Sequence, residues 1–405
     1  MLLCRPRTRR DLLMRKGYRG LVALSAATLV FAGCGTSDKT EQPEEEAPHN
    51  LGSVPATNAA EPLRDAAASI DLITHISRSG IDDTQSTVTT SVFTPKGDAP
   101  EDGFPIVALA PGATGTAPEC APSLSASLLG VVPTVVALLK AGYVVAVPDF
   151  QGLGHPSTGD DTEPQYHPYL DSTTAAYNLV DGAQAARIAV PQTSGAWLTM
   201  GIAEGGQAAW AANELADNYS YELELAGSVS VSPMTDLDGL ADAAENATLN
   251  NEQKVVLARF LAGLEAAYPE AIDLDDFRRG VAQQQWDNLL GCQPAPTAVQ
   301  VAAQIPPEDL RPTSAEALDT LRGFLQKVNL PQGPTRAPML VAYSGTEPVS
   351  PAAWTDRALN AACKLGDTIT IRKDPQPQLD SATTMTWIND RFTSTSVPND
   401  CKGRS

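Results

Sequence analysis

Basic side chains are scarce in this sequence. Lys and Arg number 28 against 48 Asp and Glu, which gives a formal net charge of −20 over 405 residues. The first 33 residues hold seven of the basic side chains and one acid, Asp11, so they carry +6 and leave −26 for the rest. Binding to nucleic acid and adsorption to anionic lipid headgroups both need basic surface. The composition therefore argues against both partners and otherwise concerns only solubility.

The N-terminal apolar run is too short to span a bilayer. Leu21–Gly33 has 13 residues and follows a basic segment that begins at Met1 or, if translation starts later, at Met14. This pattern is typical of an export signal. The run ends in Val-Phe-Ala-Gly-Cys34, which resembles a bacterial lipobox. We expect residues 1–33 to be a lipoprotein signal peptide, and Cys34 to be lipidated and to hold the protein on the bacterial cell membrane or envelope.

Large apolar side chains are also rare between residues 34 and 60, which contain three consecutive glutamates and several prolines. Such a segment cannot bury enough surface to fold. We expect a flexible acidic linker, with His49 as a solvated residue within it.

Cysteine and histidine are few. Beyond Cys34 the cysteines are Cys120, Cys292, Cys363 and Cys401, an even number that suggests two disulfides with three possible pairings. No C-x-x-C occurs, and the four histidines lie far from the cysteines, so we expect neither a metal site nor a cofactor.

The most informative stretch has the form of a nucleophile elbow. An apolar strand end leads into Gly201-Ile202-Ala203-Glu204-Gly205, and an alanine-rich helix follows. In the pattern G-x-S-x-G the serine sits on a strained strand-to-helix turn, and the glycines avoid collisions with the tight backbone. Here Ala203 occupies the serine position. The elbow of a serine hydrolase is therefore predicted without its nucleophile.

Apolar runs alternate with helical patterns across residues 61–231. Buried strands are predicted at 104–110, 142–148, 197–200 and 226–231. This alternation favours a mostly parallel sheet covered by helices on both faces, the α/β class. Residues 232–336 instead show five helical patterns, one of them at 274–290, which predict a helical cap inserted into the core. The sheet pattern resumes over residues 337–405.

Several motifs together resemble the secretory lipase family of the α/β-hydrolase fold. They are Gly201–Gly206, the turn Pro111–Gly115, Pro148–Gly154, His167–Leu170 and the segment from Gly345 to Pro351. The resemblance covers roughly residues 60–395 and includes the place of a helical cap. It implies an exported lipase or esterase with a Ser-Asp-His triad in that chain order. It also implies the disulfide pairs Cys120–Cys292 and Cys363–Cys401.

Carried onto this sequence, the family's triad fails. Its nucleophile position is Ala203, and its acid position is Glu347, which could still orient an imidazole. Its histidine belongs at Gln378 or Leu379, and all four histidines of the chain precede the elbow. For the oxyanion hole the resemblance suggests the backbone N–H groups of Gly112 and Glu204.

Other polar residues near strand ends were weighed as substitutes. Ser232 and Ser344 follow predicted strands but sit on no glycine elbow, and we expect ordinary strand-end serines. We expect His155 and His167 to be structural or to line the pocket rim. We expect Glu204 to be an exposed elbow residue rather than a general base, and Asp149 to brace the elbow.

Three functions remain open. The first is a lipoprotein without catalytic activity that keeps the acyl pocket of a lipase and binds a lipid or an ester. The second is a lipase or carboxylesterase of lipid catabolism with a non-standard catalytic set. The third is an interaction protein of the cell envelope that binds a protein partner through its cap. The sequence gives neither the ligand nor the oligomeric state.

Overall fold

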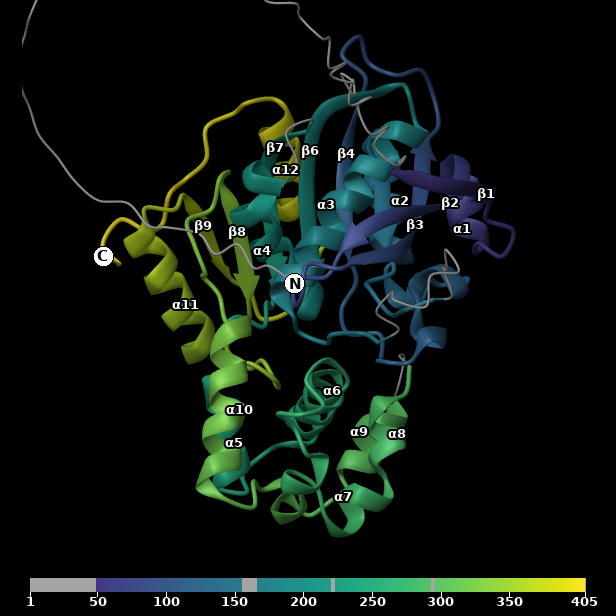
Figure 1. The fold of residues 1–405 in the computed structure, drawn as a ribbon. Coiled ribbons are helices and arrows are strands. Elements are labelled where there is room, and N and C mark those ends of the chain that lie inside the picture. Colours follow the sequence, from purple (N-terminus) through teal and green to yellow (C-terminus); the bar gives the residue numbers. More distant parts are fainter. Residues whose placement is uncertain (1–48, 155–165, 220–222, 293–295, 405) are drawn as a thin grey trace, which may run out of the picture. The chain divides into compact units, whose positions relative to one another are not determined.

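The structure is a computed structural model and describes residues 49–154, 166–219, 223–292 and 296–404. Its strands are β1 (Asn50–Pro55), β2 (Ala67–Arg78), β3 (Gln85–Pro95), β4 (Phe104–Ala110), β5 (Val144–Pro148), β6 (Thr193–Ile202), β7 (Glu224–Val231), β8 (Met339–Tyr343) and β9 (Ile369–Lys373). They form a nine-stranded sheet in the order β1-β2-β3-β5-β4-β6-β7-β8-β9 (Figure 1). From β5 to β9 in this order the strands are parallel, whereas β1, β2 and β3 pair antiparallel.

Helices cover both faces of the sheet. Helices α1 (Glu61–Ala66), α2 (Val132–Lys140) and α12 (Ala382–Phe392) pack on one face, and α3 (Ser172–Ala189), α4 (Glu204–Tyr219) and α11 (Ala352–Leu365) pack on the other. Strand β4 shows the consequence for the sequence, because Ile106 and Ala108 face α3 and α4 while Val107 and Leu109 face α2. A strand buried on both faces reads as a continuous apolar run. The predicted α/β-hydrolase architecture is confirmed.

A helical cap lies between β7 and β8 in the chain and beyond one end of the sheet in space (Figure 1). Its helices are α5 (Asp238–Glu245), α6 (Asn251–Ala267), α7 (Gly280–Gln284), α8 (Trp286–Leu290), α9 (Pro296–Ala302) and α10 (Ala315–Val328). They surround an apolar core that includes Leu257, Phe260 and Leu321, and that also takes in Tyr169 and Leu170 from the segment before α3. Ala113 and Ala203 pack against this shared cluster, so the elbow lies beside it.

The expectation of one helix over 274–290 is wrong. The structure has a short 3₁₀ turn at Leu274–Asp276, followed by α7 and α8. Gly280 has φ +52, and a Cβ there would lie 2.6 Å from Asp309 Oδ2. The tight approach of Asp309, which accepts from Val281 N at 2.7 Å, requires the chain to turn at this glycine.

The prediction that residues 34–60 form a flexible linker is wrong for the C-terminal part of that segment. β1 pairs with β2, and His49 Nε2 lies 3.0 Å from the Asp181 carbonyl oxygen, so His49 is not a solvated linker residue. Strand β1 is held by backbone hydrogen bonds to the edge of the sheet and places no large apolar side chain in the core. Composition alone therefore gives no sign of this strand. Residues 1–48, including Cys34, lie outside the described part of the chain. Among the described helices, none is long and apolar enough to cross a membrane.

Candidate functional site

The turn from β6 into α4 has the backbone of a nucleophile elbow. Ala203 lies at this turn with φ +53, a left-handed conformation that is uncommon for a residue with a side chain. A Cβ on Gly201 would lie 2.1 Å from the Gly205 carbonyl oxygen, and one on Gly205 would lie 2.2 Å from the Pro111 carbonyl oxygen. Both glycines are therefore required by close packing, and a methyl group occupies the position of the nucleophile.

The two predicted oxyanion-hole residues lie beside Ala203. Gly112 follows β4, and a Cβ built on it would be 4.0 Å from the Ala203 Cβ. Glu204 is the first residue of α4, a helix of 16 residues whose N-terminus concentrates unpaired N–H groups. The structure thus brings together the elbow and the turn that the family resemblance selected.

Glu347, at the acid position, is hydrogen-bonded without an imidazole. Its Oε1 accepts from Ser232 Oγ at 2.7 Å and from the Ser344 backbone N–H at 2.8 Å. Ser232 ends β7 with φ +44, and its own N–H donates to the Ala342 carbonyl at 2.7 Å. The carboxylate therefore fixes the ends of β7 and β8. The Ser232–Glu347 contact was not predicted. It could have been inferred, because parallel strands end at the same edge of a sheet.

The two candidate positions for the lost histidine differ in burial. Leu379 is 5% exposed and belongs to the apolar core on the α2 and α12 face, whereas Gln378 is exposed. Gln378 also lines a cavity of about 300 Å³, together with Asp374, Pro375, Pro377 and Ser381. Of the two positions, Gln378 is the one at which a polar ring could reach a cavity.

Glu204 is not the exposed elbow residue that the sequence led us to expect. Its side chain is 3% exposed, and its Oε1 lies 3.4 Å from His167 Nε2 and 3.4 Å from the Leu170 N–H. His167 is structural, as expected, since its Nδ1 lies 3.0 Å from the Gln151 carbonyl oxygen. The sequence gives no signal that Glu204 and His167 are buried, because their burial depends on the segment 166–170 folding onto the elbow. His155 lies outside the described residues.

Asp149 does not brace the elbow. It is fully buried, and its carboxylate accepts from the N–H and the hydroxyl of Ser123. Burial raises the pKa of Asp149 to about 7, although the hydrogen bonds from Ser123 act in the opposite direction. It therefore holds the 3₁₀ turn Pro122–Leu124, which follows Cys120.

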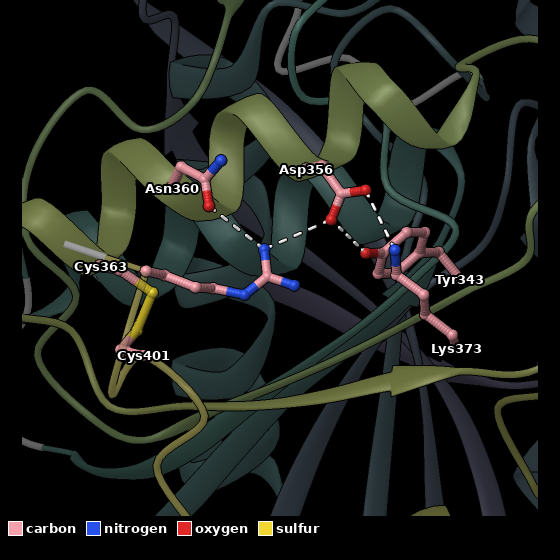
Figure 2. A network of polar contacts seen from close by, with 7 residues as sticks. Tyr343, Asp356, Asn360, Cys363, Lys373 and Cys401 are labelled. Carbon is pink, nitrogen blue, oxygen red and sulfur yellow. Dashed lines mark hydrogen bonds and ion pairs between the residues drawn. A yellow bond between two sulfur atoms is a disulfide. The ribbon is translucent and has the colours of Figure 1, made fainter.

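Both disulfides that the resemblance implied are present. Cys120–Cys292 joins the loop after the Pro111–Gly115 turn to the end of α8, and Cys363–Cys401 joins α11 to the C-terminal tail. Figure 2 shows the second bridge beside a polar network centred on Asp356, which accepts from Tyr343 and Lys373. Arg404 of the tail donates to Asp356 and Asn360 as well. Within the described residues, no group of three or more His, Cys, Asp or Glu side chains could hold a metal ion.

The sequence model of the secretory lipase family matches residues 123–399, which is more than half of the chain. The chain belongs to the secretory lipase family. No curated protein gives a significant sequence match. The elbow, the covering cap and the acid position after β8 are thus features of a lipase scaffold in this family member.

Solved structures show the same fold. Candida antarctica lipase A in its closed state has a TM-score of 0.68 at 16% identity, with 86% of this chain and 83% of that chain covered. A putative hydrolase from Legionella pneumophila has a TM-score of 0.64 at 17% identity and coverages of 85% and 95%. The rice cell wall degrading esterase LipA from Xanthomonas oryzae has a TM-score of 0.62 at 18% identity and coverages of 85% and 94%. At these identities the likeness concerns the fold alone.

Proposed function

We propose that this secretory lipase family member is an exported lipoprotein that no longer hydrolyses esters and uses its remaining site to bind a lipid or an acyl ester. The observation that carries the proposal is Ala203, which lies on an intact elbow at φ +53. A methyl group has no lone pair with which to attack a carbonyl carbon. The elbow glycines and the neighbouring Gly112 are retained around it.

The state of the acid position supports the same conclusion. A triad carboxylate orients an imidazole, but Glu347 accepts from Ser232 and from a backbone N–H. No histidine follows residue 167 in the sequence, so no imidazole comes from the usual C-terminal place. In serine hydrolases, loss of triad members leaves only about 10³–10⁴-fold rate enhancement over water. Nucleophile and base are both missing here, which goes beyond a single isolated change.

The ligand class follows from the scaffold. Ala203 and Ala113 pack against the apolar cluster that the cap shares with Tyr169 and Leu170, so the surroundings of the elbow suit hydrocarbon. The similar structures include a lipase and an esterase, which act on acyl esters. We therefore propose that this chain binds an acyl group but does not hydrolyse its ester.

The Ser232–Glu347 contact favours one alternative, an active esterase with a non-standard catalytic set. Ser232 lies at a strained turn next to the elbow, and its hydroxyl already donates to a carboxylate. The same Oε1 of Glu347, however, also accepts the Ser344 N–H, so the carboxyl group joins two strand ends in addition to facing the Ser232 hydroxyl. A protein-binding role for the cap is the third candidate, and it predicts an empty pocket.

The test combines turnover, covalent labelling and native mass spectrometry of the purified mature protein. We expect no hydrolysis of short or long acyl p-nitrophenyl esters above a heat-treated control. Labelling by a fluorophosphonate should also be absent, because this reagent needs an activated serine. Native mass spectrometry should show a retained lipid. Turnover that Ser232→Ala abolishes would establish the active esterase, and a protein that neither carries nor takes up a lipid would favour the interaction protein.

The lipid anchor is tested separately. The lipobox-like sequence predicts that wild-type protein fractionates with membranes, whereas a Cys34→Ala variant appears in the soluble fraction or the medium. The measurement is immunoblotting of both fractions. An unchanged distribution of the variant would show that Cys34 carries no anchor.

A further inference from the structure

Glu204 and His167 form a buried pair to which neither ester hydrolysis nor ligand binding assigns a role. Glu204 is 2% exposed at the start of α4, and His167 is 5% exposed in the segment before α3. Their side chains approach to 3.4 Å between Nε2 and Oε1. The ring of His167 also stacks on Phe150, with a centroid distance of 6.2 Å and an interplanar angle of 2°.

The contacts of His167 fix the orientation of its ring. Its Nδ1 faces the Gln151 carbonyl oxygen at 3.0 Å, and because a carbonyl oxygen only accepts, Nδ1 is the donor of this hydrogen bond. The opposite edge of the ring, at Nε2, lies against the Glu204 carboxyl group. Glu204 Oε1 also accepts from the Leu170 N–H at 3.4 Å. The carboxyl group therefore contacts the segment 166–170 at two places.

The segment that carries His167 is enclosed between the loop after β5 and the cap helix α6. On one side, a Cβ on Gly152 would lie 2.4 Å from the His167 nitrogen. On the other, a Cβ on Gly263 of α6 would lie 3.1 Å from the His167 carbonyl oxygen and 3.0 Å from the Tyr169 nitrogen. Helix α6 therefore rests directly on the backbone of this segment. Arg259 of α6 donates to the Leu289 and Gly291 carbonyls rather than to Glu204.

We propose that His167 and Glu204 together act as a latch that ties the elbow to the cap helix α6. The latch consists of the carboxyl, the imidazole and the segment 166–170, to which Glu204 is also bound through the Leu170 N–H. Both are positioning residues, because they act through the backbone beneath α6. The latch exists without a ligand, so its test is independent of the proposed binding function.

Hydrogen exchange of α6 tests the latch. Glu204→Leu removes the carboxyl contacts with His167 Nε2 and the Leu170 N–H, so amide protection of α6 around Gly263 should fall at least about tenfold. In Glu204→Gln the side-chain amide can donate to Nε2, so protection should stay within about threefold of wild type. Glu214→Leu is the matched control, since Glu214 is a buried carboxyl of the same helix that accepts instead from Gln332 and Gly333.

The comparison is decisive in either direction. Equal losses of α6 protection in Glu204→Leu and Glu214→Leu, or a loss in Glu204→Gln as large as in Glu204→Leu, would overturn the latch. If Glu204→Leu does not fold, Glu204→Ala and its matched control Glu214→Ala give the same comparison. If Glu204→Leu leaves α6 protection unchanged and the protein still carries its lipid, the latch is refuted while the proposed binding function is not.

Discussion

At the scale of single residues, Ala203 keeps the backbone conformation of a nucleophile elbow although its side chain is a methyl group. A left-handed backbone costs a residue with a side chain roughly 1–2 kcal/mol relative to glycine. Ala203 adopts it at φ +53 because its N–H donates to the Val231 carbonyl at 2.9 Å and the glycines on either side allow no other path. The backbone geometry of the elbow is therefore set by the neighbouring strands and does not depend on the serine.

Because the elbow survives, a catalytic set should be restorable. Ala203→Ser alone should give little activity, since no imidazole would take the serine's proton. Ala203→Ser with Gln378→His should hydrolyse p-nitrophenyl acetate about 10²-fold or more faster than either single variant, because a positioned general base contributes on that scale. The measurement is initial rate, supported by fluorophosphonate labelling.

Controls for the restored enzyme follow from burial and hydrogen bonding. Leu379→His in place of Gln378→His should fail, because Leu379 lies in the apolar core. Adding Ser232→Ala should help, since Glu347 would lose a competing donor and could accept from the new imidazole. Equal activity of the Gln378 and Leu379 variants would contradict our placement of the base.

At the scale of elements, the cap is joined to the hydrolase core by covalent and polar links. Cys120–Cys292 connects residues 172 apart in sequence, and the Thr116 N–H donates to the Leu290 carbonyl beside it. Within the cap, Arg259 of α6 donates to the Gly291 carbonyl next to the disulfide. Cys363–Cys401 instead holds a tail that Arg404 also ties to α11.

Removal of the two bridges should therefore have different effects. Cys120→Ser with Cys292→Ser should lower the free energy of unfolding by about 2–5 kcal/mol and weaken proteolytic resistance of the cap. Cys363→Ser with Cys401→Ser should mainly free the tail, because α11 and β9 remain packed in the core. Urea unfolding and limited proteolysis measure both. A cap that stays as resistant as in wild type would show that noncovalent contacts suffice.

At the scale of the whole molecule, several buried ionisable groups couple folding to pH. Burial raises the pKa of Asp149, Asp181 and Glu214 to about 7 each. Burial also lowers the pKa of His75 to about 3, with His49 contributing in the same direction. The three carboxyls bind protons in the folded state at a pH where the unfolded chain releases them, whereas His75 does the reverse.

The sign of the effect follows from these directions. Between about pH 4.5 and 7 the folded state gains protons at three carboxyls relative to the unfolded state, so their contribution to stability rises as pH falls. His75 opposes this below about pH 6.5, where the unfolded imidazole is protonated. Three groups outweigh one, so we expect the free energy of unfolding to increase from pH 7.5 to pH 5. Urea titrations at several pH values measure it, and Asp149→Asn should reduce the slope. A steady loss of stability over this range would contradict the expectation.

Much of the fold was determined by the sequence alone. The buried runs that became β4 to β8 are continuous in the chain, and each is recognisable without its neighbours. The missing nucleophile and the absence of a late histidine are also facts of the sequence. The short edge strand β1 and the break at Gly280 were not predicted, because a ladder to β2 and the approach of Asp309 come from distant parts of the chain.

Only the tertiary structure decided the environment of the polar side chains. From sequence Glu204 is predicted to be an exposed elbow residue, but in the structure the segment 166–170 covers it. Asp149 is predicted to brace the elbow, but in the structure its carboxylate accepts from Ser123. Glu347 follows β8, where the resemblance puts the acid position, but its partner Ser232 lies 115 residues away and meets it only where β7 and β8 end side by side. A side chain's local sequence gives its chemistry, whereas its burial and partners depend on contacts that the fold makes over long separations.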